Sequence, residues 1–274
     1  MNGKILPGDG AVIPLDNRAF HYGDGVFETM RVVRGRACFL EAHWERMAKG
    51  LQLLQIEMPE GLDQEQLARM IGELSAQNGL PHARGRLTVF RDSPGHYRPE
   101  HNVGAFTLEL FPVDRETYIL NERGFTVDLY PDMRKPVNAL SVYKTLGAQL
   151  YILASLWCIR HHLDNCLLQN DRGNIIEGYS GNIFIVSNGV LYTPPLSDGC
   201  LGGVMRMQLI NTALENGIKV YESSLNPQNL LVADELFFTN VASGVQWVST
   251  YRTKRYGHRM ALRLQDLLVK KMLS

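Results

Sequence analysis

A chain of 274 residues is long enough for one large domain or for two smaller ones with a real hydrophobic core. Its 28 basic and 28 acidic residues leave the net charge near zero, which argues against nucleic acid or an anionic membrane as a partner. Scattered cysteines, an N-terminus without a signal-peptide core and no apolar run of membrane-spanning length lead us to expect a cytoplasmic protein with reduced thiols and no metal site.

The first part of the chain mixes strand and helix patterns. The predicted elements are two strands joined by a two-residue turn, two helices and two more strands, at 28–33, 36–40, 41–54, 63–79, 85–91 and 104–112. Asp63 suits the N-cap of the second helix, and Gly79 suits its end. We therefore expect a small α+β domain at 1–115, followed by a polar connector at 116–125.

The remaining residues, 126–274, predict a larger second domain that continues the α+β pattern. Strands are expected at 124–130, 166–171, 174–178, 182–187, 190–194 and 235–240. Asn188-Gly189, between two of them, is the strongest hairpin signal in the chain. Helices are expected at 146–162, 203–216 and 259–273, with a short one capped at Asn226-Pro227.

Lys144, in SVYKTLGAQL, is the first candidate for chemistry. It follows a run that Pro136 holds out of helix, and it stands at the head of a mostly apolar helix. A buried ammonium is costly unless its pKa falls, and a desolvated, neutral amine is a nucleophile that can form an imine. The alternative is a surface lysine extending from the first helical turn into solvent, which this segment alone favours.

Three further segments could bind parts of one ligand. Glu177 ends a strand, where a carboxylate can hold a protonated ring nitrogen or simply cap nearby amides. Gly202 and Gly203 open a helix whose N–H groups and dipole would favour an anion, although such a pair is usually a loop. Thr239 and Asn240 end another strand and could donate to a phosphate, or form a polar strand exit.

Taken together and in chain order, several segments of the sequence resemble the fold-type IV pyridoxal-phosphate enzymes, also called class IV aminotransferases. The resemblance runs from about Asn17 to Asn240, through NRAFHYGDGVFETMRV, EAHWERM, YKTLGAQLYILAS, IIEGYSGNIF, LYTPPLSDGCLGGVMR and ADELFFTN. It implies a fold like that of D-amino-acid aminotransferase, with a small N-terminal α/β domain and a larger C-terminal domain built on a mixed, β-barrel-like sheet. It also implies pyridoxal 5'-phosphate (PLP) as the cofactor and a homodimer with shared active sites.

The resemblance assigns cofactor contacts to single residues. Lys144 matches the lysine that forms the internal aldimine, and Glu177 matches the carboxylate that pairs with the ring nitrogen. Arg46 matches the phosphate-contacting arginine, and Val204 and Met205 match positions whose backbone N–H groups hold the phosphate.

Substrate-facing positions follow from the same comparison. Tyr22 and Glu28 match wall residues near the substrate. Thr29 could relay a proton, or it could be a strand threonine chosen for its β propensity. Arg91 and Arg98, in FRDSPGHYRP, are expected to anchor substrate carboxylates from a loop, for which a solvated loop is the alternative.

Three details favour a lyase within this family. Thr29 directly follows Glu28, Met205 stands where many aminotransferases have threonine, and Thr239-Asn240 resembles lyase sequences. We therefore expect a 4-amino-4-deoxychorismate lyase, which eliminates pyruvate to give 4-aminobenzoate for folate synthesis; a branched-chain or D-amino-acid aminotransferase is the alternative. A module that only binds a phosphate compound would need neither the lysine nor the strand-end carboxylate.

Overall fold

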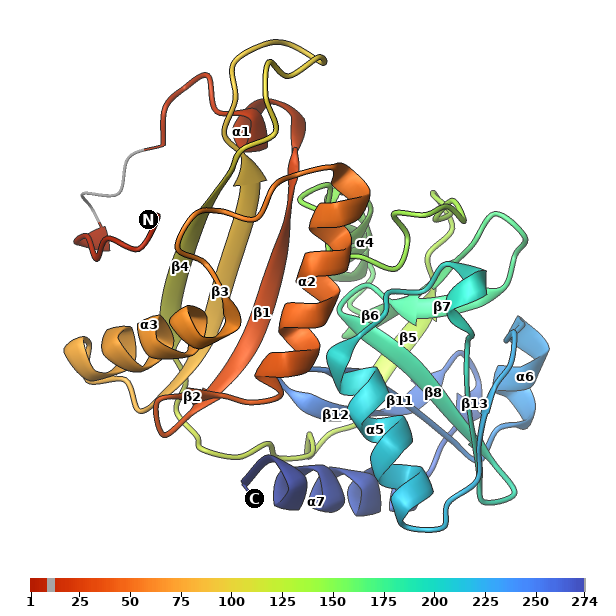
Figure 1. Cartoon of the computed structure of the whole chain (residues 1–274). Coiled ribbons are helices and arrows are strands. Elements are labelled where there is room, and N and C mark those ends of the chain that lie inside the picture. Colours follow the sequence, from red (N-terminus) through yellow and green to blue (C-terminus); the bar gives the residue numbers. More distant parts are fainter. Residues whose placement is uncertain (9–12, 274) are drawn as a thin grey trace. The chain divides into compact units, whose positions relative to one another are not determined.

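The structure, a computed structural model, describes residues 1–8 and 13–273 of the chain (Figure 1). Its residues cluster into two units. Unit 1 comprises Met1–Glu116 and Tyr143–Gly147, and unit 2 comprises Thr117–Val142 and Ala148–Ser274.

Unit 1 is built on an antiparallel sheet whose strands lie in the order β2-β1-β3-β4 (Figure 1). Its strands are β1 (Gly25–Val33), β2 (Arg36–Ala37), β3 (His82–Arg91) and β4 (Gly104–Pro112), and its longer helices are α2 (Leu40–Leu54) and α3 (Gln64–Gln77). Both helices cover the same face of the sheet, because their apolar side chains and those of the strands form one core, which includes Val26, Met30, Met47, Leu51, Leu67, Ile71, Leu87 and Phe106.

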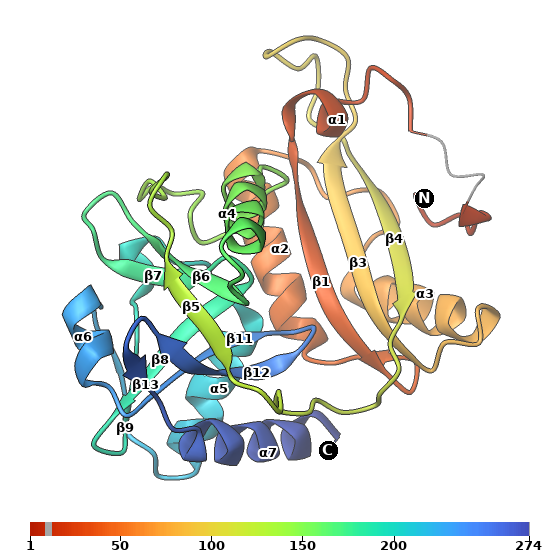
Figure 2. The same ribbon diagram turned by 180° about the vertical axis from the view of Figure 1, so that it is seen from behind.

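Unit 2 is built on a mixed sheet that closes on itself (Figure 2). Strand pairing runs β8-β11-β12-β5-β6-β7, and β7 pairs again with β8, so six strands form a ring. The pairs β12–β5 and β5–β6 are parallel, and the other pairs of the ring are antiparallel. The predicted mixed, barrel-like sheet is therefore confirmed.

The strands of unit 2 are β5 (Phe125–Leu129), β6 (Asn165–Gln169), β7 (Ile175–Gly178), β8 (Gly181–Ser187), β9 (Val190–Thr193), β10 (Val220–Glu222), β11 (Glu235–Asn240), β12 (Gly244–Tyr251) and β13 (Lys254–Arg255). Its helices are α4 (Gln149–Arg160), α5 (Val204–Glu215), α6 (Pro227–Val232) and α7 (Arg259–Leu273). Within the part of the chain that the structure describes, no helix is both long and apolar enough to cross a membrane.

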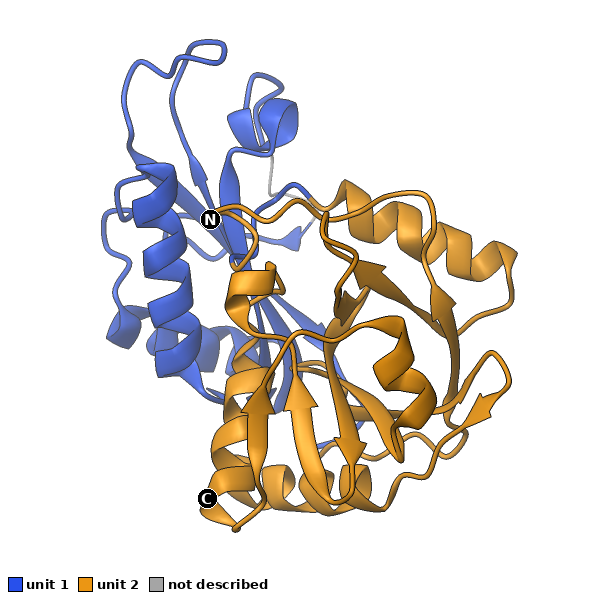
Figure 3. Ribbon diagram, turned by 90° about the vertical axis from the view of Figure 1, so that its right-hand side faces the viewer, with its two compact units in different colours: residues 1–116, 143–147 blue, residues 117–142, 148–274 orange. Residues whose placement is uncertain are grey.

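We expected the second domain, at 126–274, to be one continuous segment. The units of the structure are instead discontinuous in sequence. The segment Tyr143–Gly147 leaves unit 2 and belongs to unit 1 (Figure 3). Lys144 precedes the apolar helix α4, as expected, but α4 begins at Gln149, five residues after Lys144, so Lys144 does not lie at the helix end.

A short helix that the sequence did not reveal precedes β1. This helix, α1 (Arg18–Tyr22), begins at Asn17, whose side-chain oxygen accepts the Ala19 N–H at 2.9 Å. It ends at Gly23, which has a φ of 65°. Glycine adopts such a left-handed conformation without strain, so the turn can follow the helix directly.

Candidate functional site

Three polar residues lie in one row across neighbouring strands of the unit 2 ring. Glu177 of β7 pairs with Asn182 of β8, and Asn182 pairs with Thr239 of β11. Residues paired in register place their side chains on the same face of a sheet, and neighbouring strands are about 4.8 Å apart. The Glu177 carboxylate and the Thr239 hydroxyl therefore share a face, with backbones about 10 Å apart.

The Glu177 carboxylate is buried and surrounded by donors. Only 2% of the residue is exposed. Its Oε1 accepts hydrogen bonds from Lys135 Nζ at 2.7 Å and from the Tyr151 hydroxyl at 2.9 Å, and its Oε2 accepts the Leu201 N–H at 2.8 Å. Lys135 also donates to the backbone oxygen of Ser141 at 2.9 Å. Glu177 is thus one half of a buried ion pair with a fixed orientation.

Sequence reasoning missed Lys135 and Tyr151. Burial, together with the negative charge of Glu177, raises the pKa of the Tyr151 hydroxyl far above its usual range, so this group remains a donor. Lys135 gives only a weak signal in the sequence, a lysine before Pro136. Its contact with Glu177 joins residues that are 42 positions apart, and only the closed sheet brings them together.

The loop before α5 approaches this row of side chains closely. A Cβ at Gly203 would lie 1.9 Å from Asn182 Oδ1, so any larger residue here would force the Asn182 side chain to move. Gly203 is the N-cap of α5 and supplies no side-chain cap. The N–H groups of Val204 and Met205 lie in the first turn, where a helix offers no backbone acceptor. The helix dipole adds positive potential at the same place.

Thr239 and Asn240 differ in what their side chains already do. Thr239 is buried, and its hydroxyl oxygen has no hydrogen-bond partner among the described residues. The Asn240 side chain instead accepts the N–H groups of Ala242 and Ser243 and donates to the backbone oxygen of Ser180, which closes the turn after β11. Thr239 is therefore the better placed donor for an added anion, and the role of Asn240 as a phosphate donor stays a prediction.

Lys144 lies beside β1 within unit 1. Phe27 N–H donates to Lys144 O at 2.8 Å, and Leu146 N–H donates to Gly25 O at 3.0 Å. The Lys144 ammonium nitrogen lies 4.4 Å from the centroid of the Phe27 ring. Its backbone is thus held by strand-type pairing rather than by a helical turn.

A buried cluster of ionisable groups lies on the opposite face of β1. Arg46 Nε donates to Glu28 Oε1 at 2.8 Å, its Nη2 donates to Oε2 at 2.5 Å, and His43 Nδ1 is 2.7 Å from Oε2. Side chains alternate along a strand, so Glu28 faces α2 whereas Phe27 and Thr29 face away from it. Glu28 is therefore the partner of Arg46, and its contact with substrate stays a prediction.

The charges in this cluster determine its protonation. Burial alone would raise the pKa of Glu28, but the charge of Arg46 and the hydrogen bonds from His43 and Arg46 outweigh burial and lower that pKa. Burial lowers the pKa of His43 against the pull of Glu28. His43 is therefore neutral near neutral pH, with its Nδ1 proton directed at the carboxylate.

Arg91 is a structural residue, which corrects its expected role as a loop anchor for substrate. It is the last residue of β3 and is only 6% exposed. Its guanidinium donates to the Asp24 carboxylate, to the backbone oxygens of Leu54 and Gln55, and to the side chain of Asn102. These acceptors use the five N–H groups of an arginine, so none is left for a substrate carboxylate.

The other residues predicted to face substrate lie near the same turn. Arg18 also pairs with Asp24, at 2.8 Å, and donates to the Gly95 carbonyl at 2.9 Å. The Tyr22 ring lies 5.4 Å from that of Tyr97, centroid to centroid, in the loop between β3 and β4. Arg98 is exposed in this loop. The substrate contacts of Tyr22 and Arg98 stay predictions.

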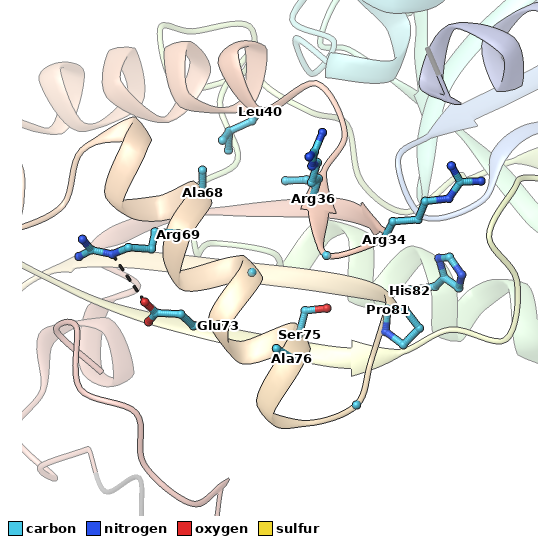
Figure 4. Close-up of a pocket in the computed structure, with 14 residues that line it drawn as sticks. Arg34, Arg36, Leu40, Ala68, Arg69, Glu73, Ser75, Ala76, Pro81 and His82 are labelled. Carbon is cyan, nitrogen blue, oxygen red and sulfur yellow. Dashed lines mark ion pairs between the residues drawn. The ribbon is translucent and has the colours of Figure 1, made fainter.

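A hollow of about 980 Å³ in unit 1 is separate from these groups. It lies between the turn that joins β1 to β2 and the helix α3, with the Arg69–Glu73 ion pair (3.7 Å) on one side (Figure 4). None of the site residues predicted from the sequence lines it, so we do not assign the chemistry to this hollow.

Comparison with known proteins yields a family and several named relatives. The family model described as Amino-transferase class IV matches residues 25–251. A putative branched-chain-amino-acid aminotransferase of Methanocaldococcus jannaschii is 32% identical over 246 residues, which cover 89% of this chain and 84% of that protein. An aminodeoxychorismate lyase of Bacillus subtilis is 26% identical over 260 residues, which cover 88% of this chain and 82% of that protein.

Solved structures agree on the fold. The crystal structure of a branched-chain aminotransferase from the thermophilic archaeon Thermoproteus uzoniensis, with norvaline, has a TM-score of 0.88 and 23% identity. The match covers 97% of this chain and 91% of that one.

Proposed function

The chain belongs to the class IV aminotransferase family, and from that premise we propose that it is a 4-amino-4-deoxychorismate lyase, which releases pyruvate and 4-aminobenzoate. Family membership makes it a PLP-dependent enzyme. The choice of reaction rests on Thr29. This residue shares a face of β1 with Phe27, whose ring the Lys144 ammonium contacts at 4.4 Å.

The residues of the chain fit PLP. A buried carboxylate at Glu177 suits a protonated ring nitrogen, and the Thr239 hydroxyl, which has no partner in the described part of the chain, suits a phosphate oxygen. The uncapped start of α5, at Val204 and Met205, offers backbone donors to the same phosphate. We propose that the Arg46 guanidinium pairs with the phosphate, which the family resemblance supports.

When bound, PLP supplies an electron sink for the charge left by a broken bond to carbon. Lys144 is the proposed attachment point, and as a free amine it takes the proton that the substrate ring loses. The Thr29 hydroxyl would relay that proton from Lys144 to the oxygen of the leaving enolpyruvyl group, and the released enol becomes pyruvate. The hydrogen bonds to Glu177 fix the orientation of its carboxylate, which would hold a protonated ring nitrogen without rotating.

One assay with two arms tests the reaction. Purified enzyme receives 4-amino-4-deoxychorismate, and 4-aminobenzoate is followed by its fluorescence; in parallel it receives leucine or D-alanine with 2-oxoglutarate. We expect 4-aminobenzoate, its loss in Lys144→Ala, and a strong decrease in Thr29→Val that Thr29→Ser restores. Amino-group exchange without 4-aminobenzoate would overturn the lyase in favour of an aminotransferase, which the 32% identity to the archaeal relative supports.

We also propose that the enzyme acts as a homodimer, which the family resemblance supports. Four apolar side chains of α4 are exposed in the single chain, namely Ile152, Leu153, Leu156 and Ile159. Such a patch is typical of an interaction surface. Light scattering should give twice the mass of one chain, and a monomeric mass in an active preparation would contradict the proposal.

A further inference from the structure

Lys135 is buried and bonded to the carboxylate of the unit 2 site, yet the proposed reaction gives it no role. Its Nζ lies 2.7 Å from Glu177 Oε1 and 2.9 Å from Ser141 O. Its backbone N–H donates to Gln169 O at 2.9 Å, which ties the residue to the end of β6. Only 8% of the residue is exposed. A positive charge is therefore fixed against one oxygen of Glu177.

The hydrogen bonds of Glu177 show which part of the carboxylate is left for a ligand. A carboxylate has about four lone-pair sites, two on each oxygen. Lys135 and Tyr151 occupy both sites of Oε1, and the Leu201 N–H occupies one site of Oε2. One site on Oε2 remains for a donor outside these groups. A ring N–H would therefore bind the oxygen that does not contact Lys135.

We propose that Lys135 is a positioning residue that keeps the proton shared by Glu177 and the cofactor ring on the ring nitrogen. The inference rests on the proposed function, in which Glu177 holds that nitrogen. In a buried site a neutral carboxylic acid facing a neutral ring nitrogen is favoured over separated charges, because burying ions is costly. The Lys135 charge stabilises the carboxylate form and reverses this preference.

The contacts of Lys135 also show that its chemical role differs from that of Lys144. An ammonium that donates to a carboxylate and to a carbonyl has no lone pair, so Lys135 does not act as a second nucleophile. Tyr151 reaches the same carboxylate oxygen but brings no charge. Comparing the loss of each donor therefore distinguishes an effect of charge from an effect of hydrogen bonding.

The test uses the holoenzyme, reconstituted with PLP carrying ¹⁵N in the ring, and reads the nitrogen chemical shift by NMR. The variants are Lys135→Gln, Lys135→Arg and Tyr151→Phe, with Lys49→Gln as the control. Lys49 also pairs with a glutamate, Glu45, but on the surface. Lys135→Met replaces Lys135→Gln if the latter does not fold. PLP affinity and kcat are measured on the same samples.

We expect a pyridinium shift in the parent enzyme, in Lys135→Arg, in Tyr151→Phe and in the control. In Lys135→Gln the shift should move towards that of a neutral pyridine. By analogy with residues that orient metal ligands, kcat should fall about 10- to 100-fold in Lys135→Gln, and Lys135→Arg should restore most of it.

Two results would overturn the inference. A pyridinium shift that persists in Lys135→Gln would show that the charge is not needed, and an equal change in Tyr151→Phe would show that hydrogen bonding suffices. Failure of the proposed PLP site, on which the inference rests, looks different. In that case the parent protein would show no borohydride-bleached chromophore that Lys144→Ala removes, and no variant at position 135 would be informative about it.

Discussion

Replacing Glu28 by glutamine should destabilise the cofactor-free protein strongly, although the two residues are almost the same size. The change leaves the Arg46 guanidinium beside a neutral amide in a site where the arginine side chain is only 10% exposed. Removing one partner of a buried ion pair typically costs about 3–5 kcal/mol, because the other charge loses its compensation. We expect the lower end, about 3 kcal/mol, since glutamine retains one acceptor oxygen for Arg46 Nε.

The free energy of unfolding is measured by urea titration of the cofactor-free protein, followed by circular dichroism. A loss of about 3 kcal/mol corresponds to a decrease of about 6–12 °C in melting temperature for a protein of this size class. The double variant Glu28→Leu with Arg46→Met removes both charges and should be more stable than Glu28→Gln, because paired apolar replacements are often neutral.

The control is Glu45→Gln on the same helix, α2. Glu45 pairs with Lys49, but both side chains are more than half exposed, so this pair should contribute nothing measurable. The reasoning is refuted if Glu28→Gln is as stable as Glu45→Gln. It is also refuted if the double variant is less stable than Glu28→Gln, which would mean that the packing of the cluster matters more than its charges.

Burial lowers the pKa of His43 below 6.5, so the unfolded chain binds more protons than the folded protein just below that pH. The free energy of unfolding should be at its full value above pH 6.5 and should fall as the pH drops towards the lowered pKa. His43→Asn should flatten this slope in urea titrations from pH 5 to 7.5. Gly203→Ala should weaken PLP binding, measured by equilibrium titration, because its Cβ would meet a β8 side chain at 1.9 Å. Gly72→Ala, whose Cβ meets nothing closer than 3.8 Å, should stabilise α3 by about 0.5–1 kcal/mol. Arg91→Met should lower the free energy of unfolding by about 1–3 kcal/mol, because buried backbone acceptors lose their donor while Arg18 still pairs with Asp24. Arg98→Met should leave stability unchanged and raise KM if Arg98 anchors substrate, and unchanged KM would remove it from the site.

Local signals in the sequence predicted the elements that local chemistry determines. Asp63 caps α3 by accepting the Gln66 N–H at 2.7 Å. Asn188 and Gly189 both have positive φ, 52° and 77°, in the turn between β8 and β9. Such turns require residues that tolerate this conformation, so the dipeptide indicates the hairpin without any knowledge of the fold.

The missed features depend on contacts that are distant in sequence or on elements too short to show a period. The helix α1 has five residues and β13 has two, fewer than a periodic pattern needs. The pairing of Lys144 with β1 depends on a partner strand more than a hundred positions earlier. Burial of Arg91 likewise follows from tertiary contacts with Asp24 and with the end of α2, whereas its neighbours in sequence suggested a solvated loop.

Closure of the six-strand ring has a consequence for the durability of the site. Strand β7 has a paired neighbour on each side, through Leu168 of β6 and Asn182 of β8, so Glu177 does not lie at an open sheet edge. Edge strands and termini open by local fraying, whereas doubly paired core strands exchange their amide hydrogens only in larger openings. The amides around Glu177 should therefore be among the slowest to exchange with deuterium, and the anchoring carboxylate should keep its place while the surface loops fluctuate.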